Sequence, residues 1–206
     1  LRHILNIAQV HGIAPHLKLT TFDADGTLYA DGAHMAHDDE MVRRIIDLMC
    51  AGVHVAIVTA AGYPDEPERF EERFRGLLDV VGRLGLDSAI TDRFHIMGGE
   101  CNYLLRLDRG GSGLAFVPDA EWKSSALATW REDDVGRLLD DAEALLRRAA
   151  ARLRLPVRIT RKPRAVGVTP TAHTIYEVLE DLALSVRAEL QLAKHCVPHC
   201  CFNGGN

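Results

Sequence analysis

The fold follows from one segment, Leu17-Lys-Leu-Thr-Thr-Phe-Asp-Ala-Asp-Gly-Thr-Leu-Tyr29. Its first six residues are mostly apolar or β-branched and a glycine turn follows them, which is typical of a buried strand that ends in a loop. Asp23 and Asp25 are two residues apart, so in extended backbone their side chains point to the same side. Open α/β sheets bind their ligands at the carboxyl ends of strands. We therefore expect both carboxylates to lie together in a site at this end of the strand.

The two carboxylates predict a Mg²⁺ site formed by Asp23 and Asp25. Like charges at one point repel each other unless a cation lies between them, and Mg²⁺ prefers oxygen ligands. A carboxylate beside Mg²⁺ can attack phosphorus to form an aspartyl-phosphate, while a second carboxylate protonates the leaving oxygen and then deprotonates water. Gly26 allows the backbone to approach a phosphate closely. The alternative is a surface turn, because Asp-x-Asp-Gly is also common in turns; the preceding strand favours the site.

A second apolar run, residues 53–58, ends at Thr59. Between the two strands the apolar spacing predicts a helix that begins at Asp38 or Asp39 and ends at Gly52. Strand, helix and strand at this spacing indicate a βαβ unit with parallel strands. Thr59 is then expected beside Asp23, where its hydroxyl can donate to a phosphate oxygen. A helix cap or a simple strand-end hydroxyl is the alternative interpretation.

Composition narrows the function classes. The 206 residues carry a net charge of −5 without a basic cluster, which argues against nucleic-acid binding. No apolar run approaches a membrane span and no signal peptide precedes the first strand, so we expect a cytoplasmic protein. The five cysteines, an odd number, are expected to be reduced. His195 to Cys201 looks like a zinc cluster, but it has no second pair of ligands, so small buried hydrophobic residues are the preferred interpretation.

The sequence pattern changes near Gly99, from strands alternating with helices to a hairpin followed by helices. We therefore predict an α/β fold: a parallel-sheet core with an inserted α+β cap domain over the site. The expected division is residues 1–98 for the core, 99–201 for the cap and 202–206 for the start of the return to the core. The expected cap elements are a hairpin over residues 103–117, helices over 133–149 and 174–192, strands over 157–160 and 165–168, and a last strand from Cys200.

The aspartate loop and Thr59 resemble the first two motifs of the haloacid dehalogenase-like (HAD) phosphatases. Longer phrases resemble the IMP-specific 5′-nucleotidases, in family order over essentially the whole chain. These phrases are Leu5-Asn-Ile-Ala-Gln9, Leu28-Tyr-Ala-Asp-Gly32, Ile57-Val-Thr-Ala-Ala-Gly-Tyr63, Met97-Gly-Gly-Glu-Cys-Asn-Tyr103, Phe116-Val-Pro118, Arg161-Lys-Pro-Arg-Ala-Val-Gly167 and Phe202-Asn-Gly-Gly-Asn206.

This resemblance implies an incomplete HAD-like Rossmannoid core and a hydrolase of purine nucleotide metabolism, which converts IMP to inosine and phosphate with Mg²⁺. It implies Asp23 as the nucleophile and Asp25 as the acid/base, and it adds Asp31 to Asp23, Asp25 and Thr59 as substrate-binding residues. Asp31 matches a family position that contacts the nucleotide; an Asp-Gly turn is the alternative. The resemblance also implies a homotetramer with ATP as an allosteric activator.

The family pattern continues past Asn206 with a phosphate-binding lysine and a metal-binding aspartate. The chain also begins with Leu rather than Met, so we expect a piece of the enzyme, cut at both ends and inactive alone. Lys162 and Lys194 are expected in the cap and are not substitutes for that lysine. Two other functions stay open: a HAD phosphatase for a sugar phosphate or phosphoamino acid, and a non-catalytic regulatory fragment.

Overall fold

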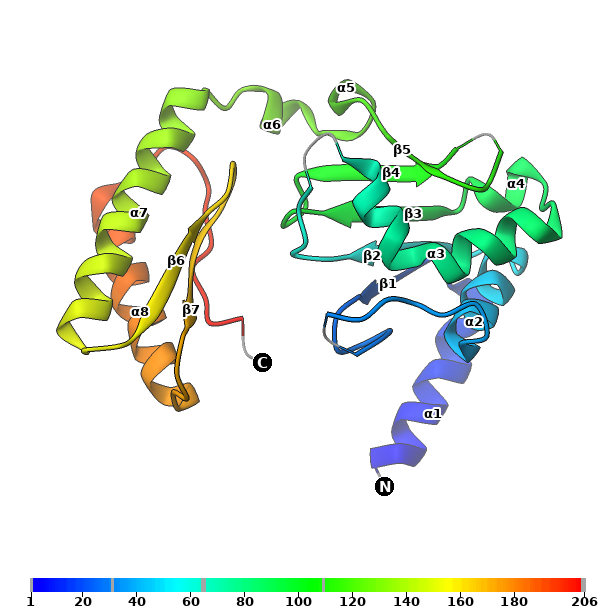
Figure 1. Ribbon diagram of the computed structural model, residues 1–206, viewed down its shortest axis with the longest axis horizontal. Helices are drawn as coiled ribbons and strands as arrows, with labels where there is room; N and C mark the ends of the chain where they lie inside the picture. The colour runs from blue at the N-terminus through cyan, green and yellow to red at the C-terminus, as the bar shows by residue number, and fades with distance from the viewer. Residues whose placement is uncertain (1, 31, 64–65, 109, 205–206) are drawn as a thin grey trace. The chain divides into compact units, whose positions relative to one another are not determined.

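A five-stranded sheet organises the first half of the chain in the computed structural model, which describes residues 2–30, 32–63, 66–108 and 110–204 (Figure 1). The strands lie in the order β1-β2-β3-β4-β5. Two compact units divide the chain, Leu1–Trp122 and Lys123–Asn206, and the five-stranded sheet belongs to the first.

The first three strands form the predicted parallel core. They are β1 (Leu19–Asp23), β2 (His54–Val58) and β3 (Phe94–Gly98), and both neighbouring pairs are parallel. Helices α2 (Glu40–Cys50) and α3 (Pro67–Leu84) lie on the crossovers between them. This confirms the α/β class and the βαβ unit.

The crossover helices form where the sequence places caps and apolar stripes. Asp39 caps α2 by accepting a hydrogen bond from the Met41 amide at 2.9 Å, and Pro67 occupies the first turn of α3. Gly85 ends α3 in the left-handed conformation, with φ +57°. The buried side chains of these two helices are Val42, Ile45, Ile46, Met49, Phe70, Phe74, Leu77, Leu78 and Val81.

The expectation of a buried first strand is wrong. No residue of β1 is buried, and Leu19 is 53% exposed. The physical reason is the place of β1 at the end of the sheet, where β2 is its only neighbour among the described strands. Phe22 packs against the core from one face of this edge strand, whereas Leu19 points to the opposite, exposed face.

The hairpin predicted to open the cap instead continues the core sheet. Strand β4 (Tyr103–Leu107) pairs antiparallel with β3, and β5 (Leu114–Phe116) pairs antiparallel with β4. A tight turn reverses the chain after β3, with positive φ angles at Gly99, Glu100 and Cys101. The division between the units therefore falls after Trp122 and not at Gly99 as the change of pattern suggested.

The second unit contains a two-stranded antiparallel sheet and two long helices (Figure 1). Its main elements are α7 (Glu132–Arg152), β6 (Val157–Arg161), β7 (Val166–Pro170) and α8 (Tyr176–Ala193). Apolar residues of α7 and α8 form a separate core, to which Val197 also belongs. This matches the predicted α+β composition, while the role of a cap over the site stays a prediction.

The last strand predicted from Cys200 is wrong within the described residues, because residues 200–204 form no strand. Phe202 is 75% exposed, whereas Cys201 packs against the core of the second unit. Residues 205–206 lie outside the described residues, so the predicted return to the core stays a prediction.

The remaining elements are short or lie on the surface. They are α1 (Arg2–Ile13), η1 (Ala14–His16), α4 (Ser88–Thr91), α5 (Asp119–Trp122) and α6 (Ser125–Ala128). Pro15 lies in η1, so α1 stops before it as predicted. Among the described residues, no helix has the length and apolar character that crossing a membrane requires.

Candidate active site

The carboxyl ends of β1 and β2 form the edge at which the predicted residues meet. The two strands pair in parallel, and their last register pair joins Asp23 to Val58. Thr59 follows Val58 directly, and its amide donates to the Met97 carbonyl oxygen at 2.9 Å. The structure therefore brings Asp23 and Thr59 to one edge of the sheet, as predicted from the βαβ spacing.

The loop after Asp23 is a closed turn. The Gly26 amide donates to the Tyr29 carbonyl oxygen at 2.8 Å, and the Leu28 amide donates to the Ala24 carbonyl oxygen at 2.9 Å. Gly26 has φ +73°, a conformation that suits glycine. Ala24 is fully buried between the two aspartates. Burial of this methyl group and the two backbone hydrogen bonds stabilise the turn.

The Asp23 carboxylate is exposed and available for chemistry. Its Oδ1 atom accepts a hydrogen bond from the Ala24 amide at 2.8 Å. Within the described part of the chain, this carboxylate has no other hydrogen bond or ion pair. A hydrogen bond from the backbone to one oxygen fixes the direction of the carboxylate while the second oxygen stays accessible.

Asp25 is half-buried and lies in a different environment. Its Oδ1 atom accepts a hydrogen bond from the Gly32 amide at 3.3 Å and another from Arg73 Nη1 at 3.3 Å. Arg73 comes from α3, and sequence analysis did not identify it. In the sequence, Arg73 stands out only by its position on the polar side of an amphipathic helix, and many arginines without a functional role share that position.

Thr59 is buried, with 5% of its surface exposed. Its Oγ1 atom accepts a hydrogen bond from the Ala61 amide at 3.1 Å. Because a hydroxyl both accepts and donates, this bond leaves the hydroxyl hydrogen available to a phosphate oxygen. Thr59 can therefore hold the backbone at the strand end and bind a phosphate at the same time, since its oxygen accepts from Ala61 while its hydroxyl hydrogen stays free to donate.

Tyr29 is a further residue of the loop that sequence analysis did not single out as part of the site. Burial, followed by the nearby Asp25 carboxylate, raises the pKa of Tyr29 to about 12. Its ring meets Phe74 edge-on, with 6.0 Å between the centroids. The phenol is therefore a hydrogen-bond donor at neutral pH, beside the acid/base candidate.

Asp31, the fourth predicted site residue, lies outside the described residues. The chain on either side of it is described: the Ala33 amide donates to the Ala30 carbonyl oxygen at 2.9 Å. Its contact with a nucleotide stays a prediction.

The predicted Mg²⁺ site is a partial ligand set. Asp23 and Asp25 supply hard carboxylate oxygens from one loop, which is the donor chemistry that Mg²⁺ prefers. Among the residues that the structure describes, no group of three or more His, Cys, Asp and Glu side chains could hold a metal ion. The two aspartates fit Mg²⁺ only as part of a coordination shell that water and phosphate oxygens also fill.

The other candidate residues from the sequence lie in the second unit. His195 Nε2 is 3.2 Å from Asp141 Oδ2, an ion pair if the histidine is protonated. The expectation that the cysteines of the His195 to Cys201 cluster are buried is wrong, because residues 200–204 form no strand and Cys196 and Cys200 are exposed, while Cys201 is only partly buried. Lys162 lies at the turn between β6 and β7, where its amide donates to the Ala165 carbonyl oxygen at 2.8 Å. Lys194 ends α8 with φ +52°. Lys162 thus belongs to a turn and Lys194 to a helix end.

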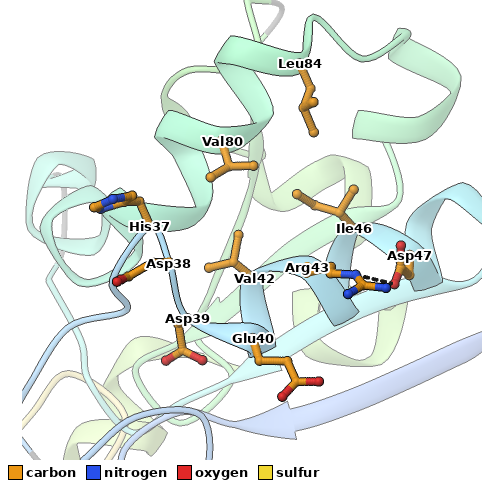
Figure 2. A pocket seen from close by; sticks show the side chains of 10 residues that line it. All are labelled: His37, Asp38, Asp39, Glu40, Val42, Arg43, Ile46, Asp47, Val80 and Leu84. Carbon is orange, nitrogen blue, oxygen red and sulfur yellow. Dashed lines mark ion pairs between the residues drawn. The ribbon is translucent and has the colours of Figure 1, made fainter.

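A surface hollow of about 480 Å³ lies elsewhere on the first unit, between α2 and α3 (Figure 2). It has an apolar floor and an acidic rim, and Arg43 pairs with Asp47 at 3.7 Å on one side. Asp23, Asp25 and Thr59 are not among its lining residues. We therefore assign the candidate site to the sheet edge, on the chemistry of its residues, and not to this hollow.

Comparison with known proteins decides the family. The family model of the IMP-specific 5′-nucleotidases matches residues 1–206. The chain belongs to the IMP-specific 5′-nucleotidase family. The resemblance noted in the sequence is thereby confirmed.

Curated members of this nucleotidase family are similar over the whole chain. IMP-specific 5′-nucleotidase 1 of Aspergillus fumigatus is 44% identical over 214 residues, which cover 100% of this chain and 47% of that protein. The Eremothecium gossypii protein is 40% identical over 226 residues, which cover 100% of this chain and 53% of that protein. The chain spans about half the length of the relatives it matches.

Solved structures of a nucleotidase from Plasmodium falciparum are similar in fold. The N-terminally truncated, IMP-bound IMP-nucleotidase has a TM-score of 0.86 and 34% identity, covering 99% of this chain and 54% of that one. The ATP-bound form of the Plasmodium enzyme has a TM-score of 0.79 and 33% identity, covering 98% and 47%.

Proposed function

We propose that the full-length protein hydrolyses IMP to inosine and phosphate through an aspartyl-phosphate on Asp23. The observation that carries this proposal is the register of β1 and β2, which sets Asp23 and Thr59 at one sheet edge beside Asp25. Family membership supports the substrate, because the curated relatives are named for IMP and a similar structure holds it.

The proposed reaction has two steps. In the first, an Asp23 carboxylate oxygen attacks phosphorus and the bond from phosphorus to the 5′ oxygen breaks, while Asp25 gives its proton to that oxygen and inosine leaves. In the second, Asp25 takes a proton from water as the water oxygen attacks phosphorus. The bond from phosphorus to Asp23 then breaks, and phosphate leaves with the carboxylate restored.

Other residues assist by binding. The Thr59 hydroxyl donates to a phosphate oxygen, and Asp31 accepts from the nucleotide. Mg²⁺, held by Asp23 and Asp25, would neutralise charge between carboxylate and phosphate. Donors and cations fixed before the reaction are usually the largest contribution to catalysis.

Regulation and assembly form a further part of the proposal. The ATP-bound Plasmodium relative supports ATP binding by the full-length protein. We infer that ATP acts as an activator, that the assembly is a homotetramer and that the protein works in the cytoplasm.

The substrate assignment is tested with purified full-length protein and Mg²⁺. Phosphate release is compared for IMP, AMP and a sugar phosphate at equal concentrations. We expect IMP to have the highest kcat/KM. A higher value for the sugar phosphate would move the function to another small phosphomonoester, and no release from any of the three would favour a non-catalytic role.

A further inference from the structure

One cation lies against the Asp25 carboxylate, the guanidinium of Arg73 on α3. Its Nη1 atom donates to Asp25 Oδ1 at 3.3 Å and to the Ala33 carbonyl oxygen at 3.0 Å. The side chains of Arg73 and Asp25 are 28% and 32% exposed, so water screens this pair less than a surface pair. A single nitrogen therefore links the aspartate loop to the segment that follows Gly32.

The backbone of α3 departs from helical geometry at the same place. Phe74, the next residue, has φ −109° and ψ 15°. The Arg73 carbonyl oxygen accepts a hydrogen bond from the Met35 amide at 2.9 Å, and the Gly76 amide donates to the Met35 carbonyl oxygen at 3.1 Å. In a straight helix, the Arg73 carbonyl and the Gly76 amide would bond within the helix. Here both bond to Met35 instead, which accounts for the kink.

Glycine at position 76 makes this approach possible. A Cβ atom there would lie 2.3 Å from the Ala36 carbonyl carbon and 2.4 Å from the Met35 oxygen. These are backbone atoms that a side-chain rotation cannot move. The segment 32–37 is thus clamped on α3 by two backbone hydrogen bonds, by close packing and by the Arg73 side chain.

The contacts of Asp25 are directional. Both the Gly32 amide and Arg73 reach Oδ1, and within the described residues no hydrogen bond reaches Oδ2. A carboxylate held by one oxygen presents the other in a fixed direction. Tyr63 also supports the cation, because a hydrogen bond between the two side chains is the largest cause that raises the pKa of Arg73.

We propose that Arg73 is a positioning residue, which fixes the orientation of Asp25 for proton transfer and braces the segment 32–37. This inference rests on the proposed function, in which Asp25 moves the proton. Arg73 acts through Asp25 and not through the substrate, and the kinked α3 is the rigid support from which it does so.

The test compares Arg73→Gln with Arg73→Lys and Arg75→Gln in the full-length protein. Arg75 lies two residues along the same helix and its side chain is exposed, which makes it the matched control. We expect Arg73→Gln to lower kcat for IMP by about 10- to 100-fold with KM changed by less than about threefold, because misplacement of a catalytic group affects turnover. Arg73→Lys should retain a higher kcat than Arg73→Gln, since lysine keeps the positive charge but lacks the planar set of donors of the guanidinium.

A double-mutant cycle separates positioning from a general loss of structure. If Arg73 acts through Asp25, Arg73→Gln has little further effect on kcat in the Asp25→Asn background. Additive losses, or Arg73→Gln within about twofold of the wild type, overturn the inference. Thermal melting identifies a variant that fails to fold, and in that case Arg73→Lys carries the comparison.

Amide hydrogen exchange gives a readout that does not need activity. Peptides that cover residues 32–37 are expected to exchange about threefold faster in Arg73→Gln, because the brace on Ala33 is lost, and at the wild-type rate in Arg75→Gln. Unchanged exchange in Arg73→Gln overturns the bracing role. A wild-type protein without IMP hydrolysis would refute the proposed function separately, and the exchange result would still decide the bracing role.

Discussion

Asp23 lies opposite Val58 at the last position of the parallel β1–β2 register. Thr59, the residue after Val58, therefore lies one position past the proposed nucleophile along the neighbouring strand. This relationship places the proposed nucleophile and the Thr59 hydroxyl at the carboxyl ends of two neighbouring strands. Strand ends held by a sheet ladder are more precise supports than mobile loops, which favours catalysis at this edge.

Replacing Asp25 with Asn is expected to slow turnover of IMP by about 10²- to 10⁴-fold, because an amide cannot transfer the proton. Formation of the phosphoryl-enzyme should persist in part, since Asp23 is unchanged. Steady-state and single-turnover assays of the full-length protein measure both quantities. Asp79→Asn, at an exposed position on α3, is the matched control. Activity of Asp25→Asn close to that of the wild type would remove Asp25 from the acid/base role.

Substitutions at Thr59 separate binding from packing. Thr59→Val keeps the shape but loses the hydroxyl, so turnover of IMP should fall by about 10²- to 10³-fold, as expected for the loss of one fixed donor. It also leaves the Ala61 amide without its acceptor, at a cost of about 1–3 kcal/mol in the free energy of unfolding. Thr59→Ser should retain most of the activity. Equal kinetics for Val and Ser would show that the hydroxyl does not bind phosphate.

The close approach at Gly76 gives a prediction about stability. Gly76→Ala is expected to lower the free energy of unfolding by about 1–3 kcal/mol or more, because its Cβ meets backbone atoms of the segment 35–37. Gly82→Ala, on the same helix, meets only Ser112, at 3.5 Å, and should be neutral or stabilise by about 0.4–1 kcal/mol. Urea denaturation measures both. Equal stability of the two variants would contradict the clamp of α3 on this segment.

The raised pKa of Tyr29 predicts a pH dependence. The folded state keeps the Tyr29 proton up to a pKa of about 12, whereas the unfolded chain loses it near its ordinary pKa, about 10. The unfolded state therefore binds fewer protons between these values, so the stabilising contribution is complete below the unfolded pKa and is lost as pH rises toward 12. Stability should fall less steeply over this range in Tyr29→Phe. Identical slopes would show that Tyr29 titrates normally.

The sequence predicted the parallel core and the meeting of Asp23 with Thr59 because both follow from local patterns. Apolar runs, a capping aspartate and the chirality of the crossover determine them. The place of the hairpin could not be predicted in this way. The pattern of residues 103–116 predicts a hairpin but does not indicate which unit contains it. The turn at Gly99 to Cys101 reverses the chain, so β4 of this hairpin pairs with β3.

Arg73 could not be predicted either, because its role depends on a long-range contact. Asp25 is far from Arg73 in sequence. The helix kink at Phe74 contains no proline, so the sequence has no signal that predicts it. The exposure of β1 is a similar case, since a strand at the end of a sheet and a strand in its centre share the same apolar composition.

Trapping the phosphoryl-enzyme tests most directly whether Asp23 is the nucleophile. The full-length protein is mixed with IMP and Mg²⁺, quenched in acid during turnover and digested, and the peptide that contains Asp23 is analysed by mass spectrometry. We expect one phosphoryl group on Asp23, its absence in Asp23→Asn, and no detectable IMP hydrolysis by that folded variant. Rapid hydrolysis by Asp23→Asn, or turnover of the wild type without phosphorylation of Asp23, would contradict this role of Asp23.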